Sequence, residues 1–210
     1  MDDLLEIIHS PEFEETEGII DLARARMEGD LLILSFNLIA GETVRDQDQA
    51  WEVECASVFE HSLTLGNCQE FSLHDDHPLL WQYIHPECSV SFYGDVSNAE
   101  AIVGDLYNRH AALVGHSIPF TRFLNGNPVD IVRGRYGMFA VGPAPLMEAY
   151  ASTFQNAGIT AGVSEPRPVR FTGDVFTGSS EIEVLVLGHS SYVIAQKFHA
   201  SRSEDQWGSQ

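Results

Sequence analysis

The chain has 210 residues, of which 44% are hydrophobic and 20% charged, a composition typical of a globular protein with a buried core and not of a disordered one. Its net charge is −20, and residues 1–100 contribute −19 of it, because they hold 22 acidic residues against three arginines and no lysine. A surface this negative repels nucleic-acid phosphates and anionic lipids, so we predict neither nucleic-acid nor membrane binding; the class of partner that it favours is a basic protein.

The N-terminal sequence and the cysteines favour a bacterial cytoplasmic protein. The first residues lack the basic start and small-residue cleavage site of a secretory signal, and no apolar run approaches the roughly 18 residues of a membrane span. Three cysteines occur without CxxC or zinc-type spacing, and we expect Cys55 to be a buried free thiol. The single lysine beside ten arginines is typical of GC-rich coding sequences.

Residues 1–17 are predicted to form an acidic N-terminal segment, with a short helix before Pro11 and a mobile part after it. Residues 17–27 fit both a strand and a helical stripe, so the sequence leaves the two open. The turn-like Glu28-Gly29-Asp30 and the apolar run 31–40 that follow favour a hairpin.

The clearest local pattern is an alternation of apolar and polar residues over 51–65. It predicts one long strand whose buried face carries Trp51, Val53, Cys55, Phe59, Leu63 and Leu65. His61 falls on the same face and is expected to be a hydrogen-bonded core histidine. Glu52, Glu54 and Glu60 fall on the opposite face, where like charges repel one another. We predict that these three glutamates bind the basic partner.

The rest of the chain predicts short strands near 70–74 and 89–93, a helical turn at 79–84, and two main helices. The first helix spans about 97–113, with capping-box spacing at Ser97 and Glu100; the second spans about 143–157 and buries Leu146, Met147, Tyr150 and Phe154. Residues 115–142 between them are Gly-rich and predicted to be irregular. Strands are expected at 169–176, 181–187 and 191–198, and a frayed tail at 201–210.

This order indicates an α+β fold with largely antiparallel sheets built from the N-terminal and C-terminal strands, without strand–helix–strand alternation. We predict a single domain over residues 18–200. A two-lobed version divided around 113–142 is the alternative.

The densest group of potential ligands is His74-Asp75-Asp76-His77. Imidazoles beside carboxylates suit a divalent metal or acid–base chemistry, so His74, Asp76 and His77 are the catalytic candidates, and His61 joins them as a metal candidate. In an extended segment, alternate residues face opposite ways, so a metal would need further ligands from elsewhere, such as Glu60, His61 or His85. The alternative is a polar turn that leads into a helix, with an acidic residue capping the N–H groups that follow.

Two further features concern small molecules. Neither GxGxxG nor GxxxxGK[ST] occurs, so the sequence identifies no cofactor. Arg122, Arg133 and Arg135 lie in the Gly-rich stretch; they could bind a carboxylate ligand, but pairing with the acidic half of the chain is the favoured interpretation.

The sequence thus favours a non-catalytic acidic binding protein, comparable in surface character to immunity or inhibitor proteins, acting through a negatively charged sheet face. The alternatives are a metal-dependent hydrolase using the 74–77 cluster, and a small-molecule-binding protein with a pocket under residues 115–142. Partner identity and oligomeric state cannot be read from the chain.

Overall fold

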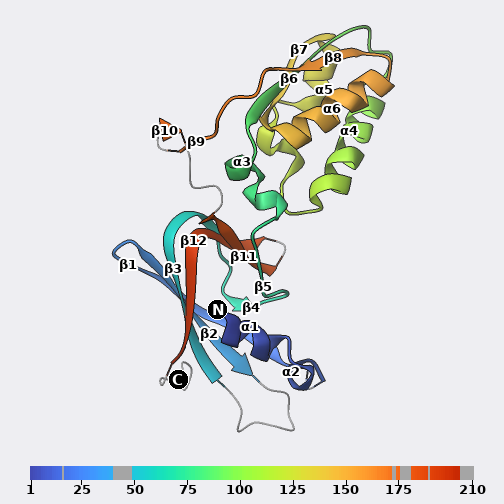
Figure 1. Ribbon diagram of the computed structural model, residues 1–210. Coiled ribbons are helices and arrows are strands. Elements are labelled where there is room, and N and C mark those ends of the chain that lie inside the picture. The colour runs from blue at the N-terminus through green and yellow to red at the C-terminus, as the bar shows by residue number, and fades with distance from the viewer. Residues whose placement is uncertain (16, 40–48, 172–173, 176–180, 189, 204–210) are drawn as a thin grey trace. The chain divides into compact units, whose positions relative to one another are not determined.

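A computed structural model describes residues 1–15, 17–39, 49–171, 174–175, 181–188 and 190–203 (Figure 1). The residues group into two compact units, unit 1 (residues 1–76 and 180–210) and unit 2 (residues 77–179). The boundaries therefore fall near residues 76 and 180, not within 113–142. The prediction of one domain concerns independent folding, which this grouping does not test.

Unit 1 is a seven-stranded antiparallel sheet in the order β4-β1-β2-β3-β12-β11-β5. Its strands combine the N-terminal and C-terminal parts of the chain, as predicted. Its elements are α1 (Asp2–Ile8), α2 (Pro11–Glu15), β1 (Ile19–Glu28), β2 (Leu31–Ile39), β3 (Gln49–Ser62), β4 (Gly66–Asn67), β5 (Ser72–His74), β11 (Glu183–Gly188) and β12 (Ser191–Ser203).

Strands β1 and β2 form the predicted hairpin and settle the open choice for residues 17–27 in favour of strand. The pairing runs from Ile19 opposite Ile39 to Glu28 opposite Leu31. Gly29 makes the turn with φ 62°, a left-handed conformation that glycine adopts without strain.

The long strand β3 follows the predicted alternation only in its first half. Trp51, Val53 and Cys55 are buried, as predicted. Ser57 then has φ 55°, and the register with β12 shifts between Ala195 opposite Val58 and Ile194 opposite Glu60. Such a bulge adds one residue to the strand and changes which side chains face the core.

Beyond Ser57, the predicted buried face is wrong at Phe59, His61 and Leu65. Phe59 is half-buried and lies outside the core cluster of unit 1, whereas Val58 packs against that cluster. Leu63 still packs against the cluster, but Leu65 is 60% exposed. His61 is exposed near the end of β3 and is not a core histidine.

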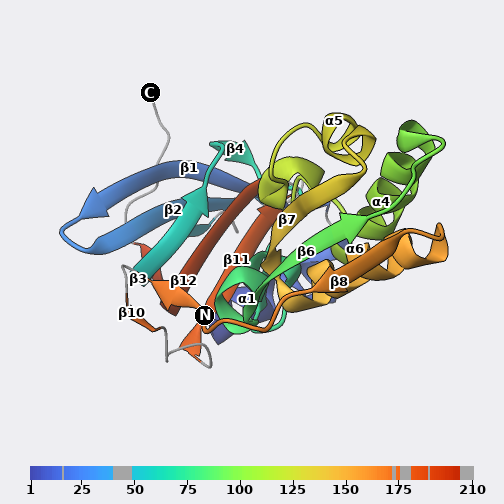
Figure 2. The same cartoon turned by 90° about the horizontal axis from the view of Figure 1, so that it is seen from above.

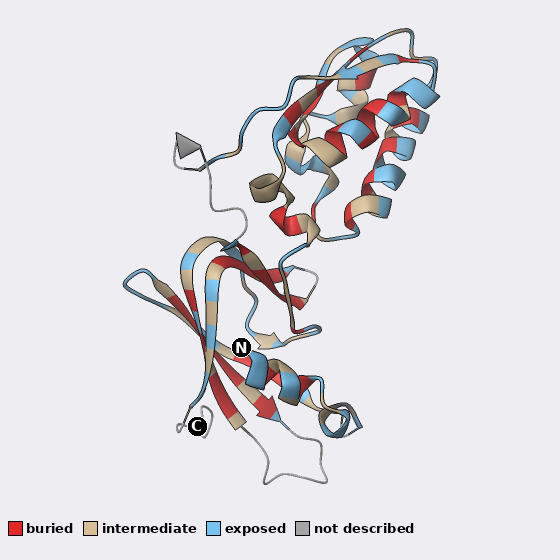
Figure 3. Ribbon diagram, in the orientation of Figure 1, coloured by how far each residue is buried: buried red, intermediate tan, exposed pale blue. Residues whose placement is uncertain are grey.

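The two edges of the unit 1 sheet are linked by a single short segment, residues 66–74. Its start pairs with β1, with the Cys68 N–H donating to the Ile20 carbonyl, and its end pairs with β11. The sheet curls as a result, and α1 lies against it, with Leu4 and Ile8 buried in the core cluster (Figures 1 and 3). The acidic N-terminal segment is thus two helices, one of them part of the core.

Unit 2 places two helices against a three-stranded antiparallel sheet of order β7-β6-β8 (Figure 2). Strand and helix alternate along the chain, contrary to the prediction, because β7 and β8 were not expected. Its elements are a 3-10 turn (Pro78–Leu80), α3 (Trp81–Ile84), β6 (Glu87–Tyr93), α4 (Ala99–Val114), a 3-10 turn (Phe120–Phe123), α5 (Pro128–Arg133), β7 (Tyr136–Pro143), α6 (Ala144–Asn156), β8 (Thr160–Val163), β9 (Arg170–Phe171) and β10 (Asp174–Val175).

The two predicted main helices are confirmed as α4 and α6, and the α+β fold class with them. All four residues expected on the buried face of α6 are fully buried. The cap of α4 is Asn98 in place of Ser97, with its Oδ1 accepting from the Ala101 N–H at 3.1 Å. No helix among the described residues is long and apolar enough to cross a membrane.

Candidate functional site

The charge asymmetry of the sequence coincides with the two structural units. Unit 1 contains 23 acidic and 5 basic residues, a net charge of −18, whereas unit 2 contains 8 and 6, a net charge of −2. Unit 1 therefore carries almost the whole negative charge of the protein in about half of its length.

The acidic residues of unit 1 are most concentrated at its start. The first 23 residues hold eight acidic residues and no lysine or arginine. The structure exposes six of these side chains, on and beside helices α1 and α2: Asp2, Asp3, Glu6, Glu12, Glu15 and Glu17. The two aspartates occupy the first turn of α1, where a carboxylate interacts favourably with the helix dipole. The apolar side of α1 contacts the sheet, so its acidic side is presented to solvent.

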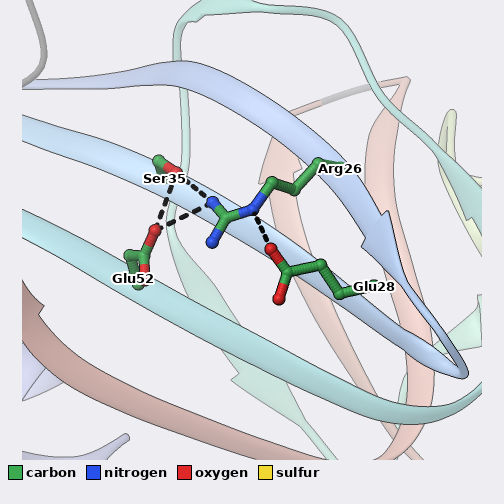
Figure 4. A network of polar contacts seen from close by, with 4 residues as sticks. All are labelled: Arg26, Glu28, Ser35 and Glu52. Carbon is green, nitrogen blue, oxygen red and sulfur yellow. Dashed lines mark hydrogen bonds and ion pairs between the residues drawn. The ribbon is translucent and has the colours of Figure 1, made fainter.

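Glu52, the first of the three predicted partner-binding glutamates, is already bound within the sheet (Figure 4). Arg26 on β1 donates to Glu52 from Nη1 at 2.9 Å and to Glu28 from Nε at 2.8 Å. The fully buried Ser35 hydroxyl lies 3.4 Å from both Arg26 Nη1 and Glu52 Oε1. These hydrogen bonds raise the pKa of Arg26, that of Glu28 having the larger effect. The positive charge of Arg26 thus interacts with the negative charges of both Glu28 and Glu52.

The other two glutamates differ from each other. Glu60 is half-buried and accepts a hydrogen bond of 2.5 Å from the Tyr192 hydroxyl on β12. Glu54 is exposed, on β3 opposite His199 of β12 and Ile33 of β2. Only Glu54 therefore has the exposed position expected of all three.

Comparison with known proteins does not indicate a function. The chain matches no protein-family model, no curated protein and no solved structure.

The candidate His74 belongs to a hydrogen-bonded row along its own strand. The Ser72 hydroxyl donates to Glu70 Oε1 at 2.6 Å, and His74 Nε2 lies 2.9 Å from the same hydroxyl oxygen. Because the serine proton is directed at Glu70, Nε2 of His74 is the donor in the second bond. Ser72 is thus not positioned to transfer its proton to His74 as a nucleophile would.

The candidate His77 caps the helical turn that follows it; the alternative interpretation of the cluster expected such a cap but assigned it to an acidic residue. Its Nδ1 accepts from the Leu79 N–H at 3.2 Å. Asp76 is the exposed last residue of the first segment of unit 1. No group of three or more His, Cys, Asp or Glu side chains in the described parts of the chain is arranged to hold a metal ion. The metal-dependent hydrolase stays a prediction.

Asp75 has neighbours that the sequence pattern did not indicate. Burial raises the pKa of Glu183 on β11, and the charges of Asp75 and of Asp2 on α1 raise it further. We call Glu183, Asp75 and Asp2 the carboxylate cluster of unit 1. Asp75 lies near Glu183 because β5 pairs with β11, with His74 opposite Val184. The negative charges of Asp75 and Asp2 thus both repel the negative charge of Glu183.

Replacement of Glu183 by Gln is expected to stabilise the protein by about 0.2–1 kcal/mol at neutral pH, since it removes this repulsion. A raised carboxyl pKa means that the wild-type protein loses stability as the pH rises through that pKa, and the variant should lack this loss. Urea melts between about pH 4 and pH 7 measure both effects. Glu54→Gln is the matched control. An equal gain in stability in that variant would show that repulsion within the carboxylate cluster does not cause the effect.

Two of the three arginines of the Gly-rich stretch form ion pairs with acidic residues from the first hundred positions. This is the interpretation that the sequence favoured over binding of a carboxylate ligand. Arg133 forms an ion pair with Glu100, and Arg135 Nη1 lies 3.1 Å from Asp95 Oδ1. Arg122 Nη2 donates to Gln82 Oε1 at 3.1 Å. A pocket of unit 2 is lined by Gln82 and residues 87 and 167–170, and none of these lies in the predicted range 115–142.

All three cysteines are free thiols. Burial raises the pKa of Cys55 to about 12 and that of Cys68 to about 11. Both therefore stay protonated near neutral pH and are unsuited to nucleophilic chemistry.

Proposed function

We propose that this protein is a non-catalytic binding protein that holds a basic protein partner on the acidic surface of unit 1. The concentration of a net charge of −18 in this unit carries the proposal. A field of one sign steers an oppositely charged partner and raises its association rate.

The helices α1 and α2 are the part of unit 1 best suited to this contact. They expose acidic side chains from a stretch of 23 residues without a lysine or arginine. Glu52 and Glu60, by contrast, already bind Arg26 and Tyr192. We therefore assign the contact to the helical surface in preference to the sheet face expected from the sequence, with Glu54 as its exposed contribution from the sheet.

The contact is tested by neutralising three exposed acids of this surface at once, with Glu6, Glu15 and Glu17 changed to Gln. We expect the association rate with a Lys/Arg-rich protein probe to fall by about tenfold. The wild-type rate should also fall between about 0.1 M and about 1 M salt, because the Debye length shrinks from about 10 Å to about 3 Å. Stopped-flow fluorescence or surface plasmon resonance measures the rates.

The matched control removes three exposed acids from unit 2, with Asp105→Asn, Glu148→Gln and Glu165→Gln. It changes the net charge by the same amount, so it should leave the association rate nearly unchanged if the surface of unit 1 is responsible. Equal losses in the two triple variants would point to net charge alone and would refute the assignment.

A further inference from the structure

The pocket of unit 2 has about 290 Å³ of volume, at the small end of the range for ligand sites. It is lined by Gln82 of α3, Glu87 at the start of β6, and the consecutive residues Arg167, Pro168, Val169 and Arg170. Two guanidinium groups and one carboxylate thus share a small pocket with the apolar surface of a proline and a valine.

The backbone fixes the relation between Glu87 and Arg167. The Glu87 N–H donates to the Arg167 carbonyl at 2.9 Å, and the Arg167 N–H donates back to the Glu87 carbonyl at 2.8 Å. Residues paired in this way project their side chains to the same side. Pro166 and Pro168 flank Arg167 and restrict its backbone further.

Arg167 differs from two other arginines of unit 2 in how its charge is balanced. Arg133 and Arg135 form ion pairs, whereas no carboxylate among the residues that the structure describes lies within ion-pair distance of Arg167. Arg122 donates to Gln82 of the lining. The pocket thus holds, in Arg167, a guanidinium group that no ion pair among the described residues balances, in a chain with a net charge of −20.

We propose that this pocket binds a small molecule through a single anionic group, a carboxylate or a phosphate, held by Arg167. Guanidinium groups match both anions in geometry and bind them by charge-assisted hydrogen bonds. Pro168 and Val169 contact the apolar part of the ligand. Glu87 disfavours a second negative charge and favours a cationic substituent, so it acts as the residue that selects among anions.

The binding experiment uses three probes with the full-length chain: inorganic phosphate, hexanoate, and norleucine, which is hexanoate with an added α-ammonium group. Calorimetry is expected to show saturable binding of at least one probe. Arg167→Gln should weaken it by about 10- to 100-fold, since a hydrogen bond to a charged group is lost. The control Arg109→Gln removes the same charge from the exposed side of α4 and should bind as the wild type does.

Glu87→Gln distinguishes the ligand classes. It should strengthen the binding of hexanoate and phosphate and weaken that of norleucine, because the neutral amide no longer repels an anion or attracts an ammonium group. Failure of all three probes to bind at millimolar concentration, or equal affinity in Arg167→Gln and the wild type, would overturn the proposal. The pocket residues all belong to unit 2, so neither result bears on the acidic surface of unit 1.

Discussion

Replacement of Phe36 by Ala is expected to lower the free energy of unfolding by about 3–5 kcal/mol. Phe36 lies on the interior strand β2, opposite Leu22 of β1 and Trp51 of β3, and is fully buried. Its ring meets that of Phe71 edge to face, with 5.2 Å between the ring centres. The variant loses this contact and leaves a cavity that the surrounding strands cannot fill. Urea unfolding followed by circular dichroism measures the change.

Phe59→Ala is the matched control for this prediction. Phe59 is an aromatic residue on the neighbouring strand β3, but it is half-buried and outside the core cluster. Its replacement should therefore cost clearly less than that of Phe36. The alternation pattern alone would assign the large loss to Phe59, so an equal or larger loss there would contradict the bulge at Ser57.

The course of β3 shows what a local pattern can and cannot predict. Alternation identified the strand and its first three buried residues, because it depends only on the two-residue period. The bulge depends on a left-handed φ at Ser57, and serine gives no signal of this conformation, which is uncommon outside glycine. After Ser57, Val58 packs against the core cluster, whereas His61 and, past the end of β3, Leu65 are exposed.

The prediction for residues 115–142 of unit 2 is wrong in part. Their glycines favour an irregular stretch, yet the stretch includes α5 and most of β7. Gly142 lies within β7, and a Cβ atom there would approach the ring of Phe123 to 2.9 Å. Close packing, which only the folded structure reveals, requires this glycine.

The candidate sites followed the same division between local and long-range information. The cap on the helical turn after His77 is local, and the sequence predicted a cap there as an alternative, although with an acidic residue in place of His77. The carboxylate cluster of Asp75, Asp2 and Glu183 is not local, since Asp2 and Glu183 lie far from Asp75 in the sequence. The pocket arginines were also missed, because the backbone pairing of residues 87 and 167 joins segments 80 residues apart.

The second large effect is expected at His110, a buried histidine of α4. Its Nδ1 accepts from the Tyr150 hydroxyl of α6 at 2.8 Å, and its Nε2 donates to the Ile118 carbonyl at 2.7 Å. Burial raises the pKa of Tyr150, which keeps the hydroxyl protonated as the donor. The imidazole thereby joins two helices and the loop after α4.

His110→Phe should lower the free energy of unfolding by about 2–5 kcal/mol, since two buried groups lose their partner at about 1–3 kcal/mol each. Addition of Tyr150→Phe to this variant should cost less than Tyr150→Phe does in the wild type, because the hydroxyl has already lost its acceptor. Tyr107→Phe, which removes an exposed hydroxyl from the same helix, should be neutral within about 0.5 kcal/mol. Additive losses at His110 and Tyr150 would show that the two side chains act separately.

The same histidine should make the stability of the protein depend on pH. Burial lowers the pKa of His110, against a smaller opposing effect of its bond to the Ile118 carbonyl. The unfolded chain therefore binds a proton at a higher pH than the folded protein does, so the contribution of His110 is complete above the unfolded pKa of about 6.5 and is lost as the pH falls below it. Urea melts from about pH 7.5 to about pH 5 should show a decline in the unfolding free energy that is smaller in His110→Phe. The exposed His61 is the control: His61→Phe should retain the full decline, because this change leaves the buried imidazole of His110 in place. An unchanged decline in His110→Phe would mean that other groups cause it and that His110 is not buried in its neutral form.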